Sequence, residues 1–203
     1  MKVLVAATKN KGKISEIKKV LSDMSFEVVS MGDIGVDIDV EEDGATFEEN
    51  SMKKAQEICK ISNKIVIADD SGLEVDFLDG APGIYSARFG GPEATDSDKN
   101  QKLLGMLKTV PFEKRTARFV CAIAVAFPDG KAFVVRDTCE GLIDFECKGS
   151  NGFGYDPIFY IPQYDKTMAQ LDTDIKNKIS HRAKALNKMA DRIREHLGDT
   201  DHL

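Results

Sequence analysis

The stretch Ile65-Val66-Ile67-Ala68-Asp69-Asp70-Ser71-Gly72 runs from three large apolar residues into two adjacent carboxylates, a hydroxyl and a glycine. Its β-branched start predicts a short buried strand. In an open α/β sheet, ligands bind just beyond the carboxyl ends of the strands, so we expect the chemistry at these polar residues. Taken alone, the stretch can also be interpreted as an ordinary turn at the end of a strand, where Asp-Ser-Gly is common.

The two adjacent aspartates are expected to do different jobs. Successive residues of a strand point to opposite faces of the sheet. One of Asp69 and Asp70 can therefore face a site while the other makes local hydrogen bonds. Gly72 would let the backbone turn sharply or let a ligand approach closely.

The composition is that of a globular protein and excludes several classes of function. With 203 residues, the chain suits one domain spanning residues 1–203, with room for two lobes. Its net charge of −6 argues against a nucleic-acid partner. The longest apolar run, Phe119 to Phe127, is too short to span a bilayer, so no membrane partner is expected. Four cysteines without a CxxC pair, and a start that lacks the apolar core of a signal peptide, predict free thiols in the reducing cytoplasm.

A basic loop near the start of the chain has the geometry of a phosphate site. Residues 3–7 predict a strand, and the apolar spacing from Ile14 to Leu21 predicts a helix. Between them lies Thr8-Lys9-Asn10-Lys11-Gly12-Lys13. Free backbone N–H groups and the helix dipole bind anions at such a place, although the spacing of a Walker A loop is absent. The dipole disfavours three lysines here, and a bound polyanion would resolve that conflict; a solvated basic turn is the alternative.

A long acidic loop follows the second predicted strand, which covers Phe26 to Val29. Clustered carboxylates on a loop, here between Asp37 and Gly44, are most often simply solvated. They can also supply oxygen ligands to Mg²⁺, which needs only one or two protein carboxylates beside substrate phosphates. Thr46 and Glu49 then form a capping-box pattern that predicts a helix through Ile58.

The second half of the chain predicts mostly strands. The stretch Leu73 to Phe77 alternates like a further strand. Residues 115–127 and 131–145 predict two long strands joined by a Pro-Asp-Gly hairpin turn. A helix capped by Thr95 or Asp96 is expected before them.

Two further segments carry groups that suit a ligand. The loop Gly149–Pro157 holds three glycines, two aromatic residues and an acid, which suits a platform for a flat ring. A tight loop buried by its own aromatic residues fits equally well. Ser180 is the expected N-cap of a last helix, so His181 and Arg182 occupy its first turn, the wrong end of a helix for cations. Lys176 lies just before them.

Five segments, in this order and at these spacings, resemble those of one family over nearly the whole chain. They are Thr8-x-Asn10-x-Gly12-Lys13, Ala68-Asp69-Asp70-Ser71-Gly72-Leu73, Gly83-x-Tyr85-Ser86-Ala87-Arg88, Phe153-Gly154-Tyr155-Asp156-Pro157 and Ser180-His181-Arg182. The family is that of the inosine/xanthosine triphosphate pyrophosphatases, the Ham1-like enzymes that hydrolyse non-standard purine nucleoside triphosphates such as dITP and XTP. One departure is Ser150-Asn151, where family members often have Thr-Gly.

The resemblance implies a fold and a reaction. The implied fold is an elongated, two-lobed α/β structure with a long mixed central sheet flanked by helices and an active-site cleft between the lobes. The implied reaction is the Mg²⁺-dependent hydrolysis of ITP, dITP or XTP to the monophosphate and pyrophosphate, which cleanses the nucleotide pool. The resemblance also implies a homodimer.

The resemblance further implies the roles of individual residues. Asp70 would be the catalytic residue that orients or deprotonates the attacking water, and Asp70 with Glu41 would hold Mg²⁺, with the adjacent Glu42 as the alternative glutamate. The residues implied to bind the substrate are Thr8, Lys9, Asn10, Lys11, Gly12, Lys13, Ser71, Phe153, Gly154, Tyr155, Asp156, Lys176, His181 and Arg182.

These residue types suit a nucleoside triphosphate. The lysines near the N-terminus suit its phosphates, and Phe153 and Tyr155 can flank its base. Lys176, His181 and Arg182 are hydrogen-bond donors, which match a 6-keto purine and leave the amino group of adenine facing another donor. A Maf-type nucleotide pyrophosphatase and a non-catalytic nucleotide-binding protein are the rival interpretations.

Overall fold

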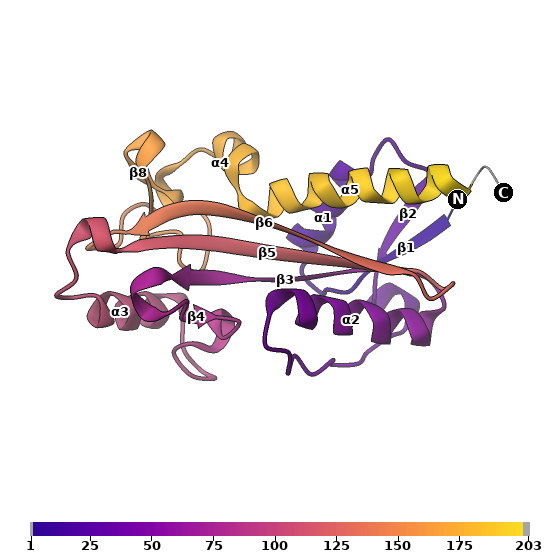
Figure 1. Ribbon diagram of the computed structural model, residues 1–203, viewed down its shortest axis with the longest axis horizontal. Helices are drawn as coiled ribbons and strands as arrows, with labels where there is room; N and C mark the ends of the chain where they lie inside the picture. The colour runs from indigo at the N-terminus through magenta and orange to yellow at the C-terminus, as the bar shows by residue number, and fades with distance from the viewer. Residues whose placement is uncertain (1, 201–203) are drawn as a thin grey trace. The chain divides into compact units, whose positions relative to one another are not determined.

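Eight strands form one mixed sheet within residues 2–200, the part of the chain that this computed structural model describes (Figure 1). The strands are β1 (Lys2–Ala6), β2 (Phe26–Ser30), β3 (Ile65–Val75), β4 (Pro82–Gly83), β5 (Thr116–Ala126), β6 (Ala132–Ile143), β7 (Phe159–Ile161) and β8 (Lys166–Thr167). The helices are α1 (Lys11–Val20), α2 (Phe47–Ser62), α3 (Asp96–Met106), α4 (Thr173–Ile179) and α5 (His181–Thr200).

The sheet combines parallel and antiparallel pairs. Its strand order is β2-β1-β3-β5-β6-β7-β8, and β4 pairs with β3. Strand β1 runs parallel to β2 and β3, whereas β4 and β7 pair antiparallel with β3 and β6, and β8 antiparallel with β7. The expected α/β class with a long mixed sheet and flanking helices is therefore confirmed. Within the described residues, no helix is both long and apolar enough to cross a membrane.

The central strand is longer than predicted. The polar residues from Asp69 onward suggested a strand end, but β3 continues through them to Val75. Leu73 and Val75 are fully buried, so burial on alternate residues resumes beyond the polar ones and keeps the chain extended. The parallel neighbour β1 ends at Ala6, which pairs with Ile67. The aspartates thus lie beyond the carboxyl end of β1, not beyond the end of their own strand.

Other predicted boundaries also shift. Helix α1 begins at Lys11, inside the segment expected to be a loop, and α2 continues to Ser62. Gly72, expected to allow a turn, is a buried residue inside β3. Helix α4 was not predicted, because two isoleucines in seven residues give too little amphipathic pattern.

The chain divides into two compact units, and the first consists of the residues to Asp70, Cys121–Asp137 and those from Arg182 onward. Alternate strand residues of this unit face two separate cores. One core packs α1 and α5 on one face of the strands and includes Leu4, Ala6, Ile65, Ile67, Ile123 and Val125. The other packs α2 on the opposite face and includes Val5, Val66, Ala68, Ala124 and Ala126. Figure 1 shows α1 and α5 on one side of these strands and α2 on the other.

This alternation decides where the two aspartates point. Asp69 continues the series of Ile65 and Ile67 and so faces α1 and α5. Asp70 continues the series of Val66 and Ala68 and so faces α2.

The second unit consists of Ser71–Val120 and Thr138–His181 and has a core of its own. Arg115 is its most unusual core residue, because its side chain is only 2% exposed. The guanidinium donates to the backbone carbonyls of Leu107 (2.6 Å), Val110 (3.0 Å) and Asp144 (2.7 Å). Three carbonyls from two loops are thereby satisfied by one side chain, which fixes the chain between α3 and β5.

Candidate active site

The predicted phosphate loop is the capped start of α1. Asn10 is the N-cap, and its Oδ1 accepts from the N–H groups of Gly12 (2.9 Å) and Lys13 (3.2 Å). Thr8 Oγ1 accepts from the N–H of Asn10 at 3.1 Å. Two of the amides expected to be free for phosphate, those of Gly12 and Lys13, are therefore occupied by the cap. Lys11 is exposed.

Asp69 forms the centre of a charged cluster, defined here as Lys13, Asp69, Arg182 and Glu16. Lys13 Nζ lies 2.7 Å and Arg182 Nη2 lies 3.5 Å from Asp69 Oδ2, and Arg182 Nε lies 3.9 Å from Glu16 Oε2. Burial alone would raise the pKa of Asp69, but the charges of Lys13 and Arg182 outweigh it and hold that pKa below its usual range. Asp69 is therefore an ionised anchor for two cations.

The charged cluster gives Arg182 partners within the protein. A small pocket of about 10 Å³ is lined by Lys13, Asp69, Arg182 and their apolar neighbours. The carboxylates of Asp69 and Glu16 offset a cation at the start of a helix, where the dipole is unfavourable. Arg182 Nε is nevertheless buried without a hydrogen-bond partner among the described residues, and the expectation that Arg182 contacts a substrate stays a prediction.

Asp70 is held on the opposite face by Asn50 of α2. Asn50 Nδ2 donates to Asp70 Oδ2 at 3.1 Å, and Asn50 Oδ1 accepts from the N–H of Gly44 at 2.8 Å. Asn50 is only 2% exposed. A Cβ on Gly44 would come within 2.8 Å of Asn50 Oδ1, so only glycine lets the loop approach this closely. One buried amide thereby ties the acidic loop to Asp70, a link that no local sequence pattern predicted.

The acidic loop places its carboxylates in different surroundings. Glu41 is exposed, whereas Glu42 forms an ion pair with Lys54 and Asp43 with Lys53. The capping box is half as predicted: Thr46 Oγ1 accepts from the N–H of Glu49 (3.1 Å), but Glu49 Oε2 accepts from Ala45 (2.6 Å) instead of Thr46.

The available carboxylates fit Mg²⁺ better than a metal held by protein alone. No group of three or more His, Cys, Asp or Glu side chains in residues 2–200 is placed to hold a metal ion. Mg²⁺ keeps several waters and binds through one or two carboxylates together with substrate phosphates. Asp70 and the acidic loop, tied together through Asn50, offer such an oxygen-only set.

The predicted base-binding loop is tightly built around Asp156. Asp156 is 5% exposed, and its Oδ2 accepts from Lys176 Nζ (2.6 Å) and from the N–H of Phe153 (3.0 Å). Gly152 has φ +83°, and a Cβ there would lie 2.0 Å from Asp156 Oδ2. We call residues 152–156 the Asp156 loop; a side chain at its first position would displace the central carboxylate.

The two aromatic residues of the Asp156 loop have opposite roles. Phe153 is 66% exposed, and Lys176 Nζ lies 5.2 Å from the centre of its ring. Tyr155 is only 5% exposed and donates its hydroxyl hydrogen to the carbonyl of Ser86 at 2.9 Å. Burial raises the pKa of Tyr155 well above its usual range. The expectation that both rings flank a base is therefore wrong for Tyr155, which packs in the core and anchors the loop.

The remaining predicted residues have separate partners. The ring of His181 stacks on that of Phe119, with centres 5.0 Å apart, and Ser71 is a half-buried residue of β3. Lys9 pairs with Asp37 at 2.7 Å, and both side chains are exposed. Lys176, His181 and Arg182, expected to act together as donors, are thus each held by a different neighbour.

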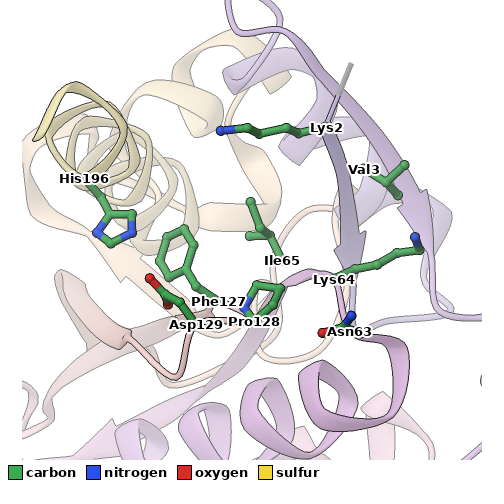
Figure 2. Close-up of a pocket in the computed structure, with 9 residues that line it drawn as sticks. All are labelled: Lys2, Val3, Asn63, Lys64, Ile65, Phe127, Pro128, Asp129 and His196. Carbon is green, nitrogen blue, oxygen red and sulfur yellow. The ribbon is translucent and has the colours of Figure 1, made fainter. Parts of the chain in front are cut away.

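A larger cavity of about 470 Å³ lies elsewhere in the first unit (Figure 2). It is lined by Lys2, Val3, Asn63, Lys64, Ile65, Phe127, Pro128, Asp129 and His196. Lys2 and Ile65 begin β1 and β3, so the cavity opens at the amino ends of these parallel strands, whereas Asp69 and Asp70 follow the carboxyl end of β1. None of the residues predicted for the site lines it, and we assign the candidate site to the aspartates.

Comparisons with known proteins agree on one family. Residues 4–192 match the model of the Ham1 family. A dITP/XTP pyrophosphatase of Desulforamulus reducens is 51% identical over 185 residues, which cover 91% of this chain and 92% of that protein. One of Clostridium perfringens is 49% identical over 200 residues, covering 96% and 98% of the two chains.

Solved structures give the same result. A HAM1 protein from Coxiella burnetii matches with a TM-score of 0.91 and 38% identity, and the Ham1 protein of Staphylococcus aureus with 0.90 and 45%. Each match covers 96% of this chain and 100% of the other.

Proposed function

The chain belongs to the Ham1 family, and we propose that it is a pyrophosphatase for non-standard purine nucleoside triphosphates. Its substrates would be ITP, dITP and XTP, and its products the monophosphate and pyrophosphate. The names of the relatives, dITP/XTP pyrophosphatases, support this substrate class. The observation that carries the proposal is the pair of adjacent aspartates on β3, one neutralised by two cations and the other held by a neutral amide.

The lysines near the N-terminus would act on the phosphates. Lys9 and Lys11 are exposed, and an exposed ion pair such as Lys9–Asp37 is weak, so both ammonium groups can take a phosphate at little cost. Lys13 is held at the start of α1 by Asp69, so its ammonium is fixed in position before an anion arrives.

Asp70 would act as the general base for the attacking water. Its carboxylate is positioned by Asn50, so it can orient the water towards the α-phosphorus and take up its proton. Asp70 and Glu41 would hold Mg²⁺, which, when bound, would neutralise negative charge on the phosphates. This assignment of metal and catalytic roles rests on the family resemblance and on the chemistry of the oxygen-only donor set.

The Asp156 loop would act on the base. Phe153 exposes the face on which a purine could stack, and Lys176 lies over that ring with donor hydrogens for a 6-keto oxygen. His181 and Arg182 are proposed as further substrate contacts from the family resemblance. A homodimer is proposed on the same ground, and a cytoplasmic location from the four cysteines without a CxxC pair.

The test is an assay of the purified protein with ITP, dITP, XTP, GTP and ATP, with and without Mg²⁺. Pyrophosphate and orthophosphate are measured separately. We expect pyrophosphate from ITP, dITP and XTP, no orthophosphate, and loss of activity with a chelator. Accumulation of a nucleoside diphosphate, or equal rates with ATP and ITP, would contradict the proposal.

A further inference from the structure

Both backbone groups of Gly154, in the middle of the Asp156 loop, are bound by side chains of α3. The N–H of Gly154 donates to Asp96 Oδ2 at 2.7 Å, and its carbonyl accepts from Asn100 Nδ2 at 3.0 Å. Asp96 and Asn100 are four residues apart, so they lie on the same face of the helix. Gly154 has φ +62°, a left-handed conformation that this pair of bonds holds in place. We call Asp96 and Asn100 the α3 clamp.

Packing alone does not explain why an asparagine occupies position 100. It is 2% exposed, and its Oδ1 is buried without a hydrogen-bond partner among the described residues. A buried acceptor without a partner lowers stability, and an apolar residue of similar size would avoid that loss. The bond from Nδ2 to the Gly154 carbonyl is the contact that only the amide supplies.

Asp96 is not needed to cap its own helix. The N-cap is Thr95, which forms a capping box with Asp98. Asp96 Oδ1 instead lies 2.6 Å from Lys99 Nζ, and that ion pair leaves Oδ2 directed at Gly154. The side chain is therefore oriented by one neighbour to bind another.

The α3 clamp acts on the residues next to Gly154 along the chain. On one side, Tyr155 is fixed by its bond to Ser86 and by burial. On the other side, Phe153 is exposed, and its N–H is bound by Asp156. With Gly154 held through both backbone groups, the backbone of Phe153 is fixed on both sides, so its exposed side chain projects from a defined position.

We propose that Asp96 and Asn100 are positioning residues that set the selectivity for the purine base without touching the substrate. This inference rests on the proposed function, because it takes the Asp156 loop as the part that binds the base. The α3 clamp fixes where Phe153 and Lys176 meet a base, so loosening it weakens recognition of the base and leaves the contacts of the phosphates as they are.

A fluorescence experiment tests, independently of activity, whether the α3 clamp restricts the motion of residue 153. The chain has no tryptophan, so Phe153→Trp places a single fluorophore in the loop. In that background, Asn100→Leu removes both the donor and the unpartnered oxygen at similar volume. We expect lower steady-state anisotropy with Asn100→Leu and unchanged anisotropy with the control Gln101→Leu, the next residue of α3, which is exposed. Equal anisotropy in both variants would overturn the proposal.

Enzyme kinetics test whether the α3 clamp affects recognition of the base and not of the phosphates. Relative to the parent with Phe153, Asn100→Leu should raise KM for ITP about three- to tenfold, the effect of one lost hydrogen bond, and lower the preference for ITP over ATP. The inhibition constant of inorganic tripolyphosphate, which has no base, should stay the same. A parallel rise in both constants, or no change in either, would overturn the positioning role.

A second pair of variants separates the bond from the charge. Asp96→Asn keeps an oxygen that can accept from Gly154 but loses the ion pair with Lys99, so it should raise KM less than Asp96→Leu, which should behave like Asn100→Leu. If both Asp96 variants raise KM equally, the α3 clamp does not act through this bond. Failure of the proposed function is visible separately, because the unmodified protein would then show no preference for ITP over ATP.

Discussion

The charged cluster of the first unit and the Asp156 loop of the second hold their polar groups by different means. In the charged cluster, two cations share one oxygen of Asp69, and charge offsets charge. In the Asp156 loop, Asp156 also meets a cation, but most of the bonds run to the backbone, at Phe153 and Gly154 and from Tyr155 to Ser86. The cluster should therefore respond most to the loss of a charge, and the loop to the loss of a single donor or acceptor.

The largest effect is expected at Asp70, which lies next to the charged cluster but outside it. Asp70→Asn keeps the volume of the side chain and removes the proposed base and metal ligand. We expect turnover of ITP to fall by about 10²–10⁴-fold. Circular dichroism and thermal unfolding should show an intact fold. Retention of more than about a tenth of the parental rate would be too much for a residue with a general-base role.

The difference between the charged cluster and the Asp156 loop is tested by replacing Asp69 and Asp156, one at a time, with asparagine. Asp69→Asn leaves Lys13 and Arg182 as two mostly buried cations without their shared anion. Its loss of unfolding free energy should approach the lower end of the range of about 3–5 kcal/mol for a broken buried pair. Asp156→Asn leaves one cation, Lys176, and should cost less. Urea denaturation measures both, and equal losses would mean that charge compensation does not distinguish the two regions.

A smaller effect is expected when one cation leaves the charged cluster. Lys13→Ala should raise KM for ITP by about tenfold, because one charge-assisted contact with a phosphate is lost. Binding of inosine, which has no phosphate, should not change. Calorimetric titration with inosine provides that comparison, and a matching loss for both ligands would place Lys13 outside the phosphate site.

The smallest effect concerns the two rings of the Asp156 loop. Tyr155→Phe removes one buried hydrogen bond and should lower unfolding free energy by about 1 kcal/mol with little change in kcat/KM. Phe153→Ala should do the opposite, with little effect on stability and a higher KM for ITP. Thermal unfolding and initial rates on both variants decide the matter. A large catalytic loss in Tyr155→Phe would show that this ring does contact the base.

Local pattern was sufficient to predict several features of the first unit. The strand predicted from Ile65 onward implied that Asp69 and Asp70 face opposite sides, because side-chain direction in a strand depends only on parity. The cap at Thr46 and the hairpin between β5 and β6 also follow from a few adjacent residues. Such features need no knowledge of distant contacts.

Features that depend on distant residues were not predictable in this way. Asp69 and Arg182 are 113 positions apart, and no pattern in either segment predicts their contact. Tyr155 is aromatic whether it stacks on a ligand or packs in a core, so its burial could not be predicted from type alone. Asn50 lies in a regular helical pattern, and its bond to Asp70 emerges only when α2 packs on β3.

The unbroken course of β3 has a consequence for insertions and deletions. Since the two aspartates differ in role only by the face on which they lie, a shift of one residue in the pairing of β3 with β1 would exchange them. A shift in one direction would place Asp69 opposite Asn50, and a shift in the other direction would place Ser71 there. The composition of the strand would hardly change. A single-residue insertion or deletion between Ile65 and Asp69 should thus reduce activity far more than one in the exposed acidic loop. The reason is that the register of β3 decides on which face of the sheet each carboxylate lies.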